Sequence, residues 1–243
     1  LGREIRAAFV PEKGWQLLIA DYSQIELRLL AHLSRDPVLM DAFTKGQDIH
    51  TRTASEVFGV APDTVTADMR RMAKAVNFGI VYGQTPFGLS MQLGITRQQA
   101  ELYILNYFER YHGVKDYIDQ TIAEVRQSGV SKTMFGRERP IPDMHSRNPN
   151  ARGFAERTAI NTPMQGGAAD LIKMAMIRID RILSDGWRTR MLLQVHDELV
   201  LESPPEEATR AASMVKQEME GVYQLAVPLV VETGIGENWR DAK

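Results

Sequence analysis

The sequence predicts an α+β protein: an antiparallel sheet backed by helices, with an all-helical segment inserted into the sheet domain. Three observations predict this class. Short apolar strands lie near both ends of the 243-residue chain, helical periodicity fills most of residues 48–129, and a strand–turn–strand pattern occupies residues 191–202. A chain of this length can bury a large core, either as one domain or as two modest lobes.

The first part of the chain is expected to pass from strands to a helix. Residues 1–20 have strand character, interrupted by a turn at Pro11–Gly14. Ile25, Leu29 and Leu33 then recur every four residues, which predicts a helix at this point.

The rest of the chain is mostly helical in pattern. Three further helices are expected, over residues 67–82, 96–111 and 114–127. Residues 130–150 are rich in Gly, Pro and Asn and predict a loop or an irregular hairpin. A long helix over about 152–183 is expected to bend at Pro163, because proline has no N–H to donate inside a helix. A helix near 205–222 and a closing strand at 226–231 complete the order.

Composition excludes several classes of protein. Apolar residues make up 44% and charged residues 25%, which is typical of a globular protein and excludes disorder. The chain has no Cys, which excludes disulfides, thiolate metal sites and a thiol nucleophile, and favours a reducing, cytoplasmic location. No apolar run is long enough to predict a membrane span or an export leader, so no membrane partner is expected.

Charge is informative only locally. The net charge of −2 gives no overall nucleic-acid footprint. Residues 126–157, however, hold seven Lys and Arg against three Asp and Glu, which fits either a solvated loop or a surface that follows phosphates.

The chain begins without an initiator Met, in sequence typical of a domain interior, so we expect a fragment of a longer protein; residues 237–243 have the pattern of a natural end.

Two acidic residues at strand ends predict a metal site. The turn at His196-Asp197-Glu198 has adjacent carboxylates where a tight hairpin usually carries Asn-Gly or Asp-Gly, and this clustering is unfavourable unless a cation is bound. The strand Leu17–Ala20 ends in Asp21, which would meet Asp197 if the two strands are neighbours. Paired carboxylates suit phosphoryl transfer, although an isolated Asp is more often a turn or cap residue, and the pair would also suit a nuclease or phosphatase.

A second pattern favours a nucleotide substrate. Arg70, Lys74, Phe78 and Tyr82 are spaced by four, and each such step on a helix turns about 40° beyond a full revolution and rises about 6 Å. The four side chains then form one stripe, with cations at one end and aromatic rings at the other. This order matches a nucleoside triphosphate, although a solvated first turn followed by core aromatics would have the same pattern.

Five motifs, in the family's order, resemble those of the DNA polymerase I family (family A). They are Asp21-Tyr-Ser-Gln-Ile-Glu-Leu-Arg28, Asp48-Ile49-His50, Arg70–Gly83, Arg157–Gly166 and Gln194-Val-His-Asp-Glu198. The resemblance covers essentially the whole chain. It implies the palm and fingers of a right-hand polymerase fold, with the palm at 1–48 and 145–243 and the fingers at 49–144.

The resemblance also implies roles for individual residues. It implies catalytic roles for Asp21, Asp197, Glu198 and Lys74. It implies that two Mg²⁺ ions are held by Asp21, Asp197 and the main-chain carbonyl of Tyr22. It implies nucleotide contacts from Arg70, Lys74, Phe78, Tyr82, His50, Glu26 and Gln24. It implies contacts to a primer–template from Arg157, Asn161, Gln165 and His196.

Some of these roles are specific. Lys74 would donate a proton to the pyrophosphate leaving group, Phe78 would pack on the incoming sugar and base, and Tyr82 would shape the space for the templating base. Glu26 would exclude a 2′-hydroxyl, although it could also pair with a neighbouring Arg. Gln165 could instead be a buried or capping amide at the expected helix bend.

The implied activity is DNA-directed DNA synthesis from dNTP on a primer–template, by a protein expected to be a monomer. The family's thumb, its proofreading-type domain and the first part of its palm lie upstream and are missing from the sequence. Gly167 stands where the family commonly has Thr.

Three alternatives remain open. A single-subunit RNA polymerase shares the aspartates and the fingers Lys, but Glu26 and Phe78 argue against it. A metal-dependent nuclease has no use for the stripe from Arg70 to Tyr82. A fragment that binds nucleotide or nucleic acid without turnover is compatible with the missing thumb.

Overall fold

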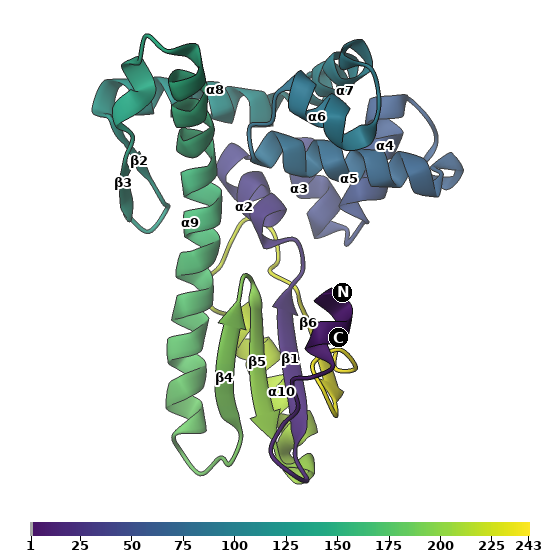
Figure 1. Cartoon of the computed structure of the whole chain (residues 1–243), viewed down its shortest axis with the longest axis vertical. Helices are drawn as coiled ribbons and strands as arrows, with labels where there is room; N and C mark the ends of the chain where they lie inside the picture. The colour runs from purple at the N-terminus through teal and green to yellow at the C-terminus, as the bar shows by residue number, and fades with distance from the viewer. Residues whose placement is uncertain (1) are drawn as a thin grey trace. The chain divides into compact units, whose positions relative to one another are not determined.

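The computed structural model describes residues 2–243, which divide into two compact units. Of the described residues, unit 1 comprises 2–25, Ala168–Gln224 and Pro228–Lys243, and unit 2 comprises Glu26–Gly167 and Leu225–Val227. Antiparallel strands lie in unit 1 and most of the helices in unit 2, so the predicted α+β class is confirmed (Figure 1). Within residues 2–243 no helix combines the length and the apolar character needed to span a bilayer.

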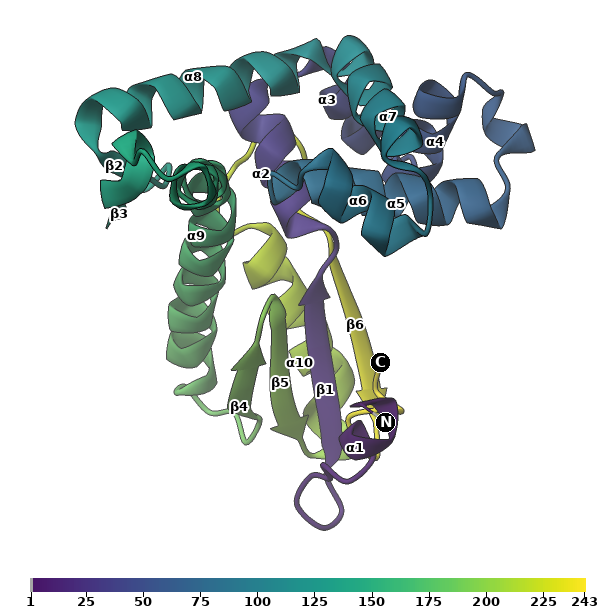
Figure 2. The same cartoon turned by 45° about the horizontal axis from the view of Figure 1, so that its top comes forward.

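Unit 1 is built on a four-stranded antiparallel sheet in the order β4-β5-β1-β6 (Figures 1 and 2). Its strands are β1 (Gln16–Tyr22), β4 (Arg190–Val195), β5 (Glu198–Ser203) and β6 (Val231–Gly236). The predicted strand–turn–strand at 191–202 is confirmed as β4 and β5. Leu17 to Ala20 are buried on both sides of the pleat, which explains why this strand has a continuous apolar run instead of an alternating one.

Different elements cover the two faces of this sheet. Helix α10 (Pro205–Glu220) packs against β1, β5 and β6 with an apolar stripe at helical spacing. The buried residues of that stripe are Ala208, Ala211, Ala212, Val215 and Met219. On the other face, Leu17, Ile19 and Val200 form a buried cluster with Trp239 and Ala242. The last residues of the chain therefore belong to the core of unit 1.

Two predictions about strands are wrong. Residues Gly2–Arg6 form a short helix, α1, and the segment after it docks on Trp239 instead of pairing in a sheet: the Phe9 carbonyl accepts a 3.1 Å hydrogen bond from the Trp239 backbone N–H. The closing strand is β6, about five residues later than predicted. Pro228 lies in the predicted strand and has no N–H for a sheet ladder, so pairing begins only beyond it.

Unit 2 consists mainly of packed helices. They are α2 (Ile25–Ser34), α3 (Pro37–Thr44), α4 (Ile49–Phe58), α5 (Ala67–Val81), α6 (Pro86–Leu93), α7 (Arg97–Arg110), α8 (His112–Ser128) and the first part of α9 (Pro149–Leu183). Several begin at an N-cap whose side chain accepts from the first turn, including Thr66 before α5 and Thr96, with Gln99, before α7. The predicted helices at 67–82, 96–111 and 114–127 are thus confirmed.

The irregular hairpin predicted within 130–150 is confirmed as β2 (Val130–Lys132) and β3 (Glu138–Pro140), and it compensates for the proline inside α9. Pro163 cannot donate to the carbonyl of Ala159 four residues earlier. The Ser131 hydroxyl of β2 donates a 2.9 Å hydrogen bond to that buried carbonyl instead. A proline in mid-helix is therefore tolerated because a neighbouring strand satisfies the carbonyl that it leaves without a partner.

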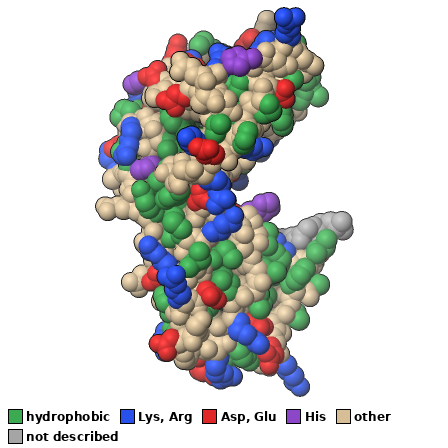
Figure 3. All heavy atoms as spheres, turned by 90° about the vertical axis from the view of Figure 1, so that its left-hand side faces the viewer, with side chains coloured by type: hydrophobic (Ala, Val, Ile, Leu, Met, Phe, Trp, Pro, Cys, Tyr) green, Lys and Arg blue, Asp and Glu red, His purple; other side chains and the backbone are tan. Residues whose placement is uncertain are grey.

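Charged side chains are interspersed on the face shown in Figure 3. Lys and Arg side chains lie among Asp, Glu and hydrophobic ones there, without one continuous basic area. This distribution agrees with the net charge of −2 and leaves local clusters as the places where charge can act.

Candidate active site

The first group of candidate residues lies where β1 meets the β4–β5 turn of unit 1. Asp21 is directly opposite Glu198 in the sheet register, and the backbone N–H of Tyr22 donates a 3.1 Å hydrogen bond to the Asp197 carbonyl. Burial raises the pKa of Asp197, and the negative charge of Asp21 raises it further. The structure therefore brings together the two carboxylates that the sequence predicted to converge.

Strained turns flank this acidic pair. His196 begins the β4–β5 turn with φ 56°, and the Gln194 side chain donates a 2.6 Å hydrogen bond to its carbonyl. Gln24, in the turn after β1, also has φ 56°. A non-glycine residue in this left-handed region costs about 1–2 kcal/mol, and such strain concentrates at functional sites. His196 is exposed and Gln24 is half-buried.

The Tyr22 side chain holds the end of β1 in place. Its hydroxyl donates a 2.7 Å hydrogen bond to the carbonyl of Met219 near the end of α10, and burial raises the pKa of the phenol. The backbone that follows Asp21 is therefore anchored on both sides, by Met219 and by Asp197. This anchoring limits how far the two carboxylates can separate.

Glu198 has a different environment from the acidic pair. It is 2% exposed, and its carboxylate accepts a 2.5 Å hydrogen bond from the Trp239 indole N–H. The Lys243 amine pairs with Glu198 and also lies 2.9 Å from Asp21 Oδ2. Arg6 lies 3.6 Å from Glu198. Burial lowers the pKa of Lys243, but the hydrogen bonds to Glu198 and Asp21 outweigh it and the net shift is upward.

The carboxylates of Asp21 and Asp197 fit a divalent metal ion. Among the residues described here, no three or more His, Cys, Asp or Glu side chains are arranged as a ready metal cluster. Mg²⁺, however, is usually bound by one or two carboxylates together with waters and substrate phosphates, not by an all-protein cage. Asp21 and Asp197 fit that requirement, because they are two adjacent oxygen donors whose mutual repulsion a cation would relieve.

The second group of candidate residues lies along α5 in unit 2. Arg70 and Lys74 are exposed, Phe78 is half-buried, and Tyr82 caps the end of the helix. The Phe78 and Tyr82 rings stack with centroids 6.2 Å apart, and the His50 ring lies 5.9 Å from Phe78. The predicted stripe is therefore present, with cations at its start and aromatic rings at its end.

The cationic end of the stripe is held by α4. Asp48, the N-cap of α4, lies 2.5 Å from Arg70 Nε and also accepts from the backbone N–H of His50. Burial acts to raise the pKa of Asp48, but the hydrogen bonds from Arg70, Thr51 and His50 lower it overall. Burial, together with the charges of Arg70 and Lys74, lowers the pKa of His50 to about 4 despite the opposing effect of Asp48. His50 is therefore a neutral imidazole at neutral pH.

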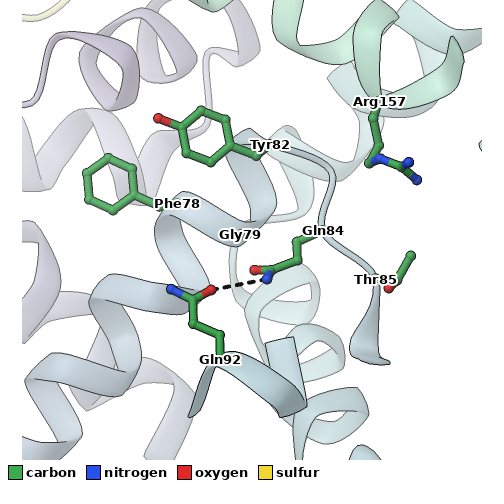
Figure 4. A pocket seen from close by; sticks show the side chains of 7 residues that line it. All are labelled: Phe78, Gly79, Tyr82, Gln84, Thr85, Gln92 and Arg157. Atoms are coloured by element: carbon green, nitrogen blue, oxygen red, sulfur yellow. Dashed lines mark hydrogen bonds between the residues drawn. The ribbon is translucent and has the colours of Figure 1, made fainter. Parts of the chain in front are cut away.

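Tyr82 forms one wall of a pocket of about 410 Å³ in unit 2 (Figure 4). The pocket is lined by Phe78, Gly79, Tyr82, Gln84, Thr85, Gln92 and Arg157. Gln84 donates a 3.1 Å hydrogen bond to Gln92 and fills the space beside Gly79, where an added Cβ would lie 2.8 Å from its Oε1. Outside the pocket, the Tyr82 hydroxyl donates a 2.9 Å hydrogen bond to Glu26, which joins two predicted nucleotide contacts.

The predicted DNA contacts on α9 have three different environments. Arg157 reaches the pocket beside Tyr82. Asn161 is half-buried, and its Oδ1 is a buried atom without a hydrogen-bond partner among residues 2–243. Gln165 is exposed, so it is not the buried amide that was considered as an alternative.

Sequence reasoning missed several residues of both groups. Arg6, Trp239 and Lys243 surround Glu198, but they come from the two ends of the chain and no local pattern connects them. Asn77 lies behind His50 on the buried side of α5. A polar residue among the apolar positions Ala75, Val76 and Ile80 is the one signal that could have identified Asn77.

The comparison with protein families is decisive. A profile described as DNA polymerase family A matches residues 1–241. The chain belongs to DNA polymerase family A. The resemblance inferred from the five motifs is thereby confirmed.

Individual members of family A are also similar. The chain is 56% identical to DNA polymerase I of Streptococcus pneumoniae (strain ATCC BAA-255 / R6) over its whole length, and 54% identical to DNA polymerase I of Bacillus subtilis (strain 168). It spans 28% of the length of each of these relatives. A solved structure, the POL domain of Pol1 from M. smegmatis in complex with DNA primer-template and dNTP, superposes with a TM-score of 0.95 at 45% identity, covering 99% of this chain and 43% of that chain.

Proposed function

We propose that the chain carries the catalytic part of a DNA-directed DNA polymerase. It would transfer a nucleotide from dNTP to a primer 3′-hydroxyl: the 3′-oxygen bonds to the α-phosphorus, the bond to the β-phosphate oxygen breaks, and pyrophosphate leaves. The convergence of Asp21 and Asp197 carries this proposal. The similarity to a Pol1 domain in complex with primer-template and dNTP supports the choice of substrates.

Asp21 and Asp197, with the main-chain carbonyl of Tyr22, would hold two Mg²⁺ ions. Bound ions would lower the pKa of the attacking hydroxyl and stabilise the leaving oxygen. Glu198 would support the site from behind, because its carboxylate is already paired with Trp239 and Lys243.

The α5 stripe would bind the incoming nucleotide. Arg70, Lys74 and His50 would hold the triphosphate, and Lys74 would give a proton to the pyrophosphate as it leaves. Phe78 would pack on the sugar and base. Gln24 would contribute a further nucleotide contact from the strained turn after β1.

Sugar selection would depend on Glu26. The Tyr82 hydroxyl fixes its carboxylate at 2.9 Å, which would leave no space for a 2′-hydroxyl on the bound sugar. The pocket beside Tyr82 would accept the templating base. Arg157, Asn161, Gln165 and His196 would contact the primer–template, where minor-groove acceptors are nearly the same for every base pair.

The assignment of subdomains follows from these roles. Residues 1–48 and 145–243 would form the palm and residues 49–144 the fingers. The protein would act as a monomer in the cytoplasm, where dNTP and DNA are available.

A primer-extension assay tests this proposal. The chain is incubated with a primer–template, Mg²⁺ and either dNTP or ribonucleotides, beside an Asp21→Asn variant. We expect extension with dNTP by the unmodified chain and none by the variant. Extension by both would refute the metal role of Asp21, extension with ribonucleotides alone would favour an RNA polymerase, and primer degradation would favour a nuclease.

A second candidate is a fragment that binds nucleotide or nucleic acid without turnover. The observation in its favour is that the chain spans only 28% of its relatives' length. Binding of primer–template and dNTP without extension by the unmodified chain would support it.

A further inference from the structure

A buried row of polar side chains lies behind His50 in unit 2. Asn77 Nδ2 lies 3.1 Å from His50 Nδ1, and Asn77 Oδ1 accepts a 3.1 Å hydrogen bond from the Thr53 hydroxyl. The Thr53 hydroxyl in turn lies 3.2 Å from the hydroxyl of Tyr111. Asn77, Thr53 and Tyr111 are 0% exposed, and His50 is 3% exposed. Asn77, Thr53 and Tyr111 have no role in the proposed reaction.

The buried end of the row decides its direction. The Tyr111 hydroxyl has one proton to donate, and within residues 2–243 its only hydrogen-bond partner is Thr53. If the row ran outward from His50, the tyrosine proton would have no acceptor in a fully buried site, which is the costly arrangement. The favourable order is therefore Tyr111 O–H to Thr53, Thr53 O–H to Asn77 Oδ1, and Asn77 N–H to His50 Nδ1.

This order determines the form of the imidazole. Nδ1 of His50 must accept a hydrogen bond, so the proton of the neutral ring resides on Nε2. Nε2 has no protein partner among the described residues, whereas Nδ1 is held by Asn77. A second proton on Nδ1 would face the N–H of Asn77, and the charges of Arg70 and Lys74 on α5 oppose it as well, while Asp48 on α4 favours it.

We propose that the row Tyr111–Thr53–Asn77 positions His50 as a neutral imidazole with its proton on Nε2, so that it offers a directed N–H donor to a nucleotide phosphate. The phosphate as acceptor rests on the proposed function; the locked ring does not. The triphosphate site would then have two cations, Arg70 and Lys74, and one uncharged donor. Asn77, Thr53 and Tyr111 are positioning residues that act through His50.

The first test observes the ring itself. Nitrogen-15 NMR of the imidazole in the nucleotide-free chain reports which nitrogen carries the proton. We expect the Nε2–H form of His50 throughout the range from pH 8 to about pH 5.5, below the ordinary His pKa of about 6.5. An Nδ1–H form, or a ring that becomes doubly protonated near its ordinary pKa, would overturn the proposal.

Two buried tyrosines provide a matched pair of variants. Tyr111→Phe removes the donor at the end of the row, so the Asn77 amide is no longer held in one orientation and the Nδ1–H form should become detectable. Tyr107→Phe is the control, because the Tyr107 hydroxyl is equally buried, its ring lies 4.6 Å from that of Tyr111, and it has no hydrogen-bond partner among the described residues. The same His50 spectrum in both variants would contradict the proposed direction of the row.

An Asn77→Asp variant separates the lock from its use. A carboxylate at this position accepts from Nδ1–H, so the ring should change form and its pKa should rise. Affinity for dNTP with Mg²⁺ is measured by calorimetry at a pH where NMR shows the variant's ring neutral and protonated on Nδ1. It should fall at least about tenfold, since Nε2 then has no proton to donate and a hydrogen bond to a charged group is lost. If the His50 ring changes to the Nδ1–H form and the affinity for dNTP is unchanged, His50 is not a phosphate donor. Loss of dNTP binding in the Asp21→Asn and Lys74→Ala variants, by contrast, reports on the nucleotide site as a whole. Melting curves confirm that each variant is folded.

Discussion

The two groups of candidate residues have opposite electrostatic character. In unit 1, burial and then the charge of Asp21 raise the pKa of Asp197 although the Lys243 amine lies 2.9 Å from Asp21, so negative charge predominates in the acidic pair. In unit 2, burial and the charges of Arg70 and Lys74 lower the pKa of His50 to about 4 although Asp48 opposes them, so positive charge predominates in this group. The first environment suits a divalent cation and the second suits a polyphosphate, which are the two parts of a metal–nucleotide complex.

The groups are also built in different ways. In unit 1 the carboxylates are placed by backbone pairing, since Asp21 faces Glu198 in the register and Tyr22 bonds to Asp197. In unit 2 the stripe is placed by the four-residue spacing of a single helix, with support from α4. Substitutions of the Asp21 or Asp197 side chain should therefore alter chemistry without altering the fold, whereas the buried residues behind the stripe also contribute to stability.

The largest expected effect tests the acidic group. Asp197→Ala should reduce nucleotide incorporation by at least about 10³-fold, more than the loss of a single transition-state hydrogen bond usually costs. The fold should remain, because the sheet contact at this position is made by the Asp197 backbone. Single-nucleotide primer extension and circular-dichroism melting measure the two effects. Asp185→Ala, at an exposed position of unit 1, is the control. Retained extension by Asp197→Ala would remove the metal site from the account.

The next effect tests the basic group. Lys74→Ala should reduce incorporation by about 100-fold, because a cation that stabilises the leaving pyrophosphate is removed. Lys45→Ala changes another exposed lysine of unit 2, paired with Asp41, and should have no effect. Steady-state extension at varied dNTP concentration measures the incorporation rate of each variant. Equal activity of the two variants would mean that the stripe does not bind the phosphates.

Stability at acidic pH tests the buried histidine. The folded pKa of His50, about 4, is below the ordinary 6.5, so the unfolded chain binds the extra proton between these values. This stability is fully present above pH 6.5 and is lost as pH falls, by about 2 kcal/mol at pH 5. Urea unfolding at pH 7 and pH 5 should show a smaller decrease for His50→Gln than for the unmodified chain. His112→Gln, at an exposed position, should retain the full decrease; identical pH dependence in all three proteins would contradict the assignment.

The smallest effect tests sugar selection. Glu26→Ala should raise the incorporation of ribonucleotides relative to deoxyribonucleotides by at least about tenfold, the typical value of one misfit group in a binding site. Competition between ATP and dATP in primer extension measures the ratio. Glu101→Ala, on the exposed side of α7, should leave it unchanged. If Glu26→Ala does not change the ratio either, the carboxylate held by Tyr82 does not exclude the 2′-hydroxyl.

Residues whose position depends on local periodicity could be predicted from the sequence. Asp21 and Asp197 follow apolar strand segments, and strand ends meet when the strands pair, so their proximity could be inferred before the structure. The α5 stripe follows from helical spacing alone. Their roles as metal ligands and phosphate contacts remain predictions that the experiments above test.

Residues that meet only through tertiary packing could not be predicted. Lys243 and Arg6 reach Glu198 from opposite ends of the chain, and no sequence pattern pairs them. The first residues were predicted as strands from their local strand character, and docking on Trp239 overrides that character. These differences show tertiary contacts deciding between local conformations of similar energy.

The central claim is that Asp21 and Asp197 jointly bind a divalent cation, and Mn²⁺ binding tests it most directly. Electron paramagnetic resonance titration of the nucleotide-free chain should show binding that falls at least about tenfold in Asp21→Asn and in Asp197→Asn. The double variant should lose less Mn²⁺-binding free energy than the two single variants lose together, because the residues share one site. Mn²⁺ affinity that is unchanged in both single variants, or losses that simply add, would contradict a shared site.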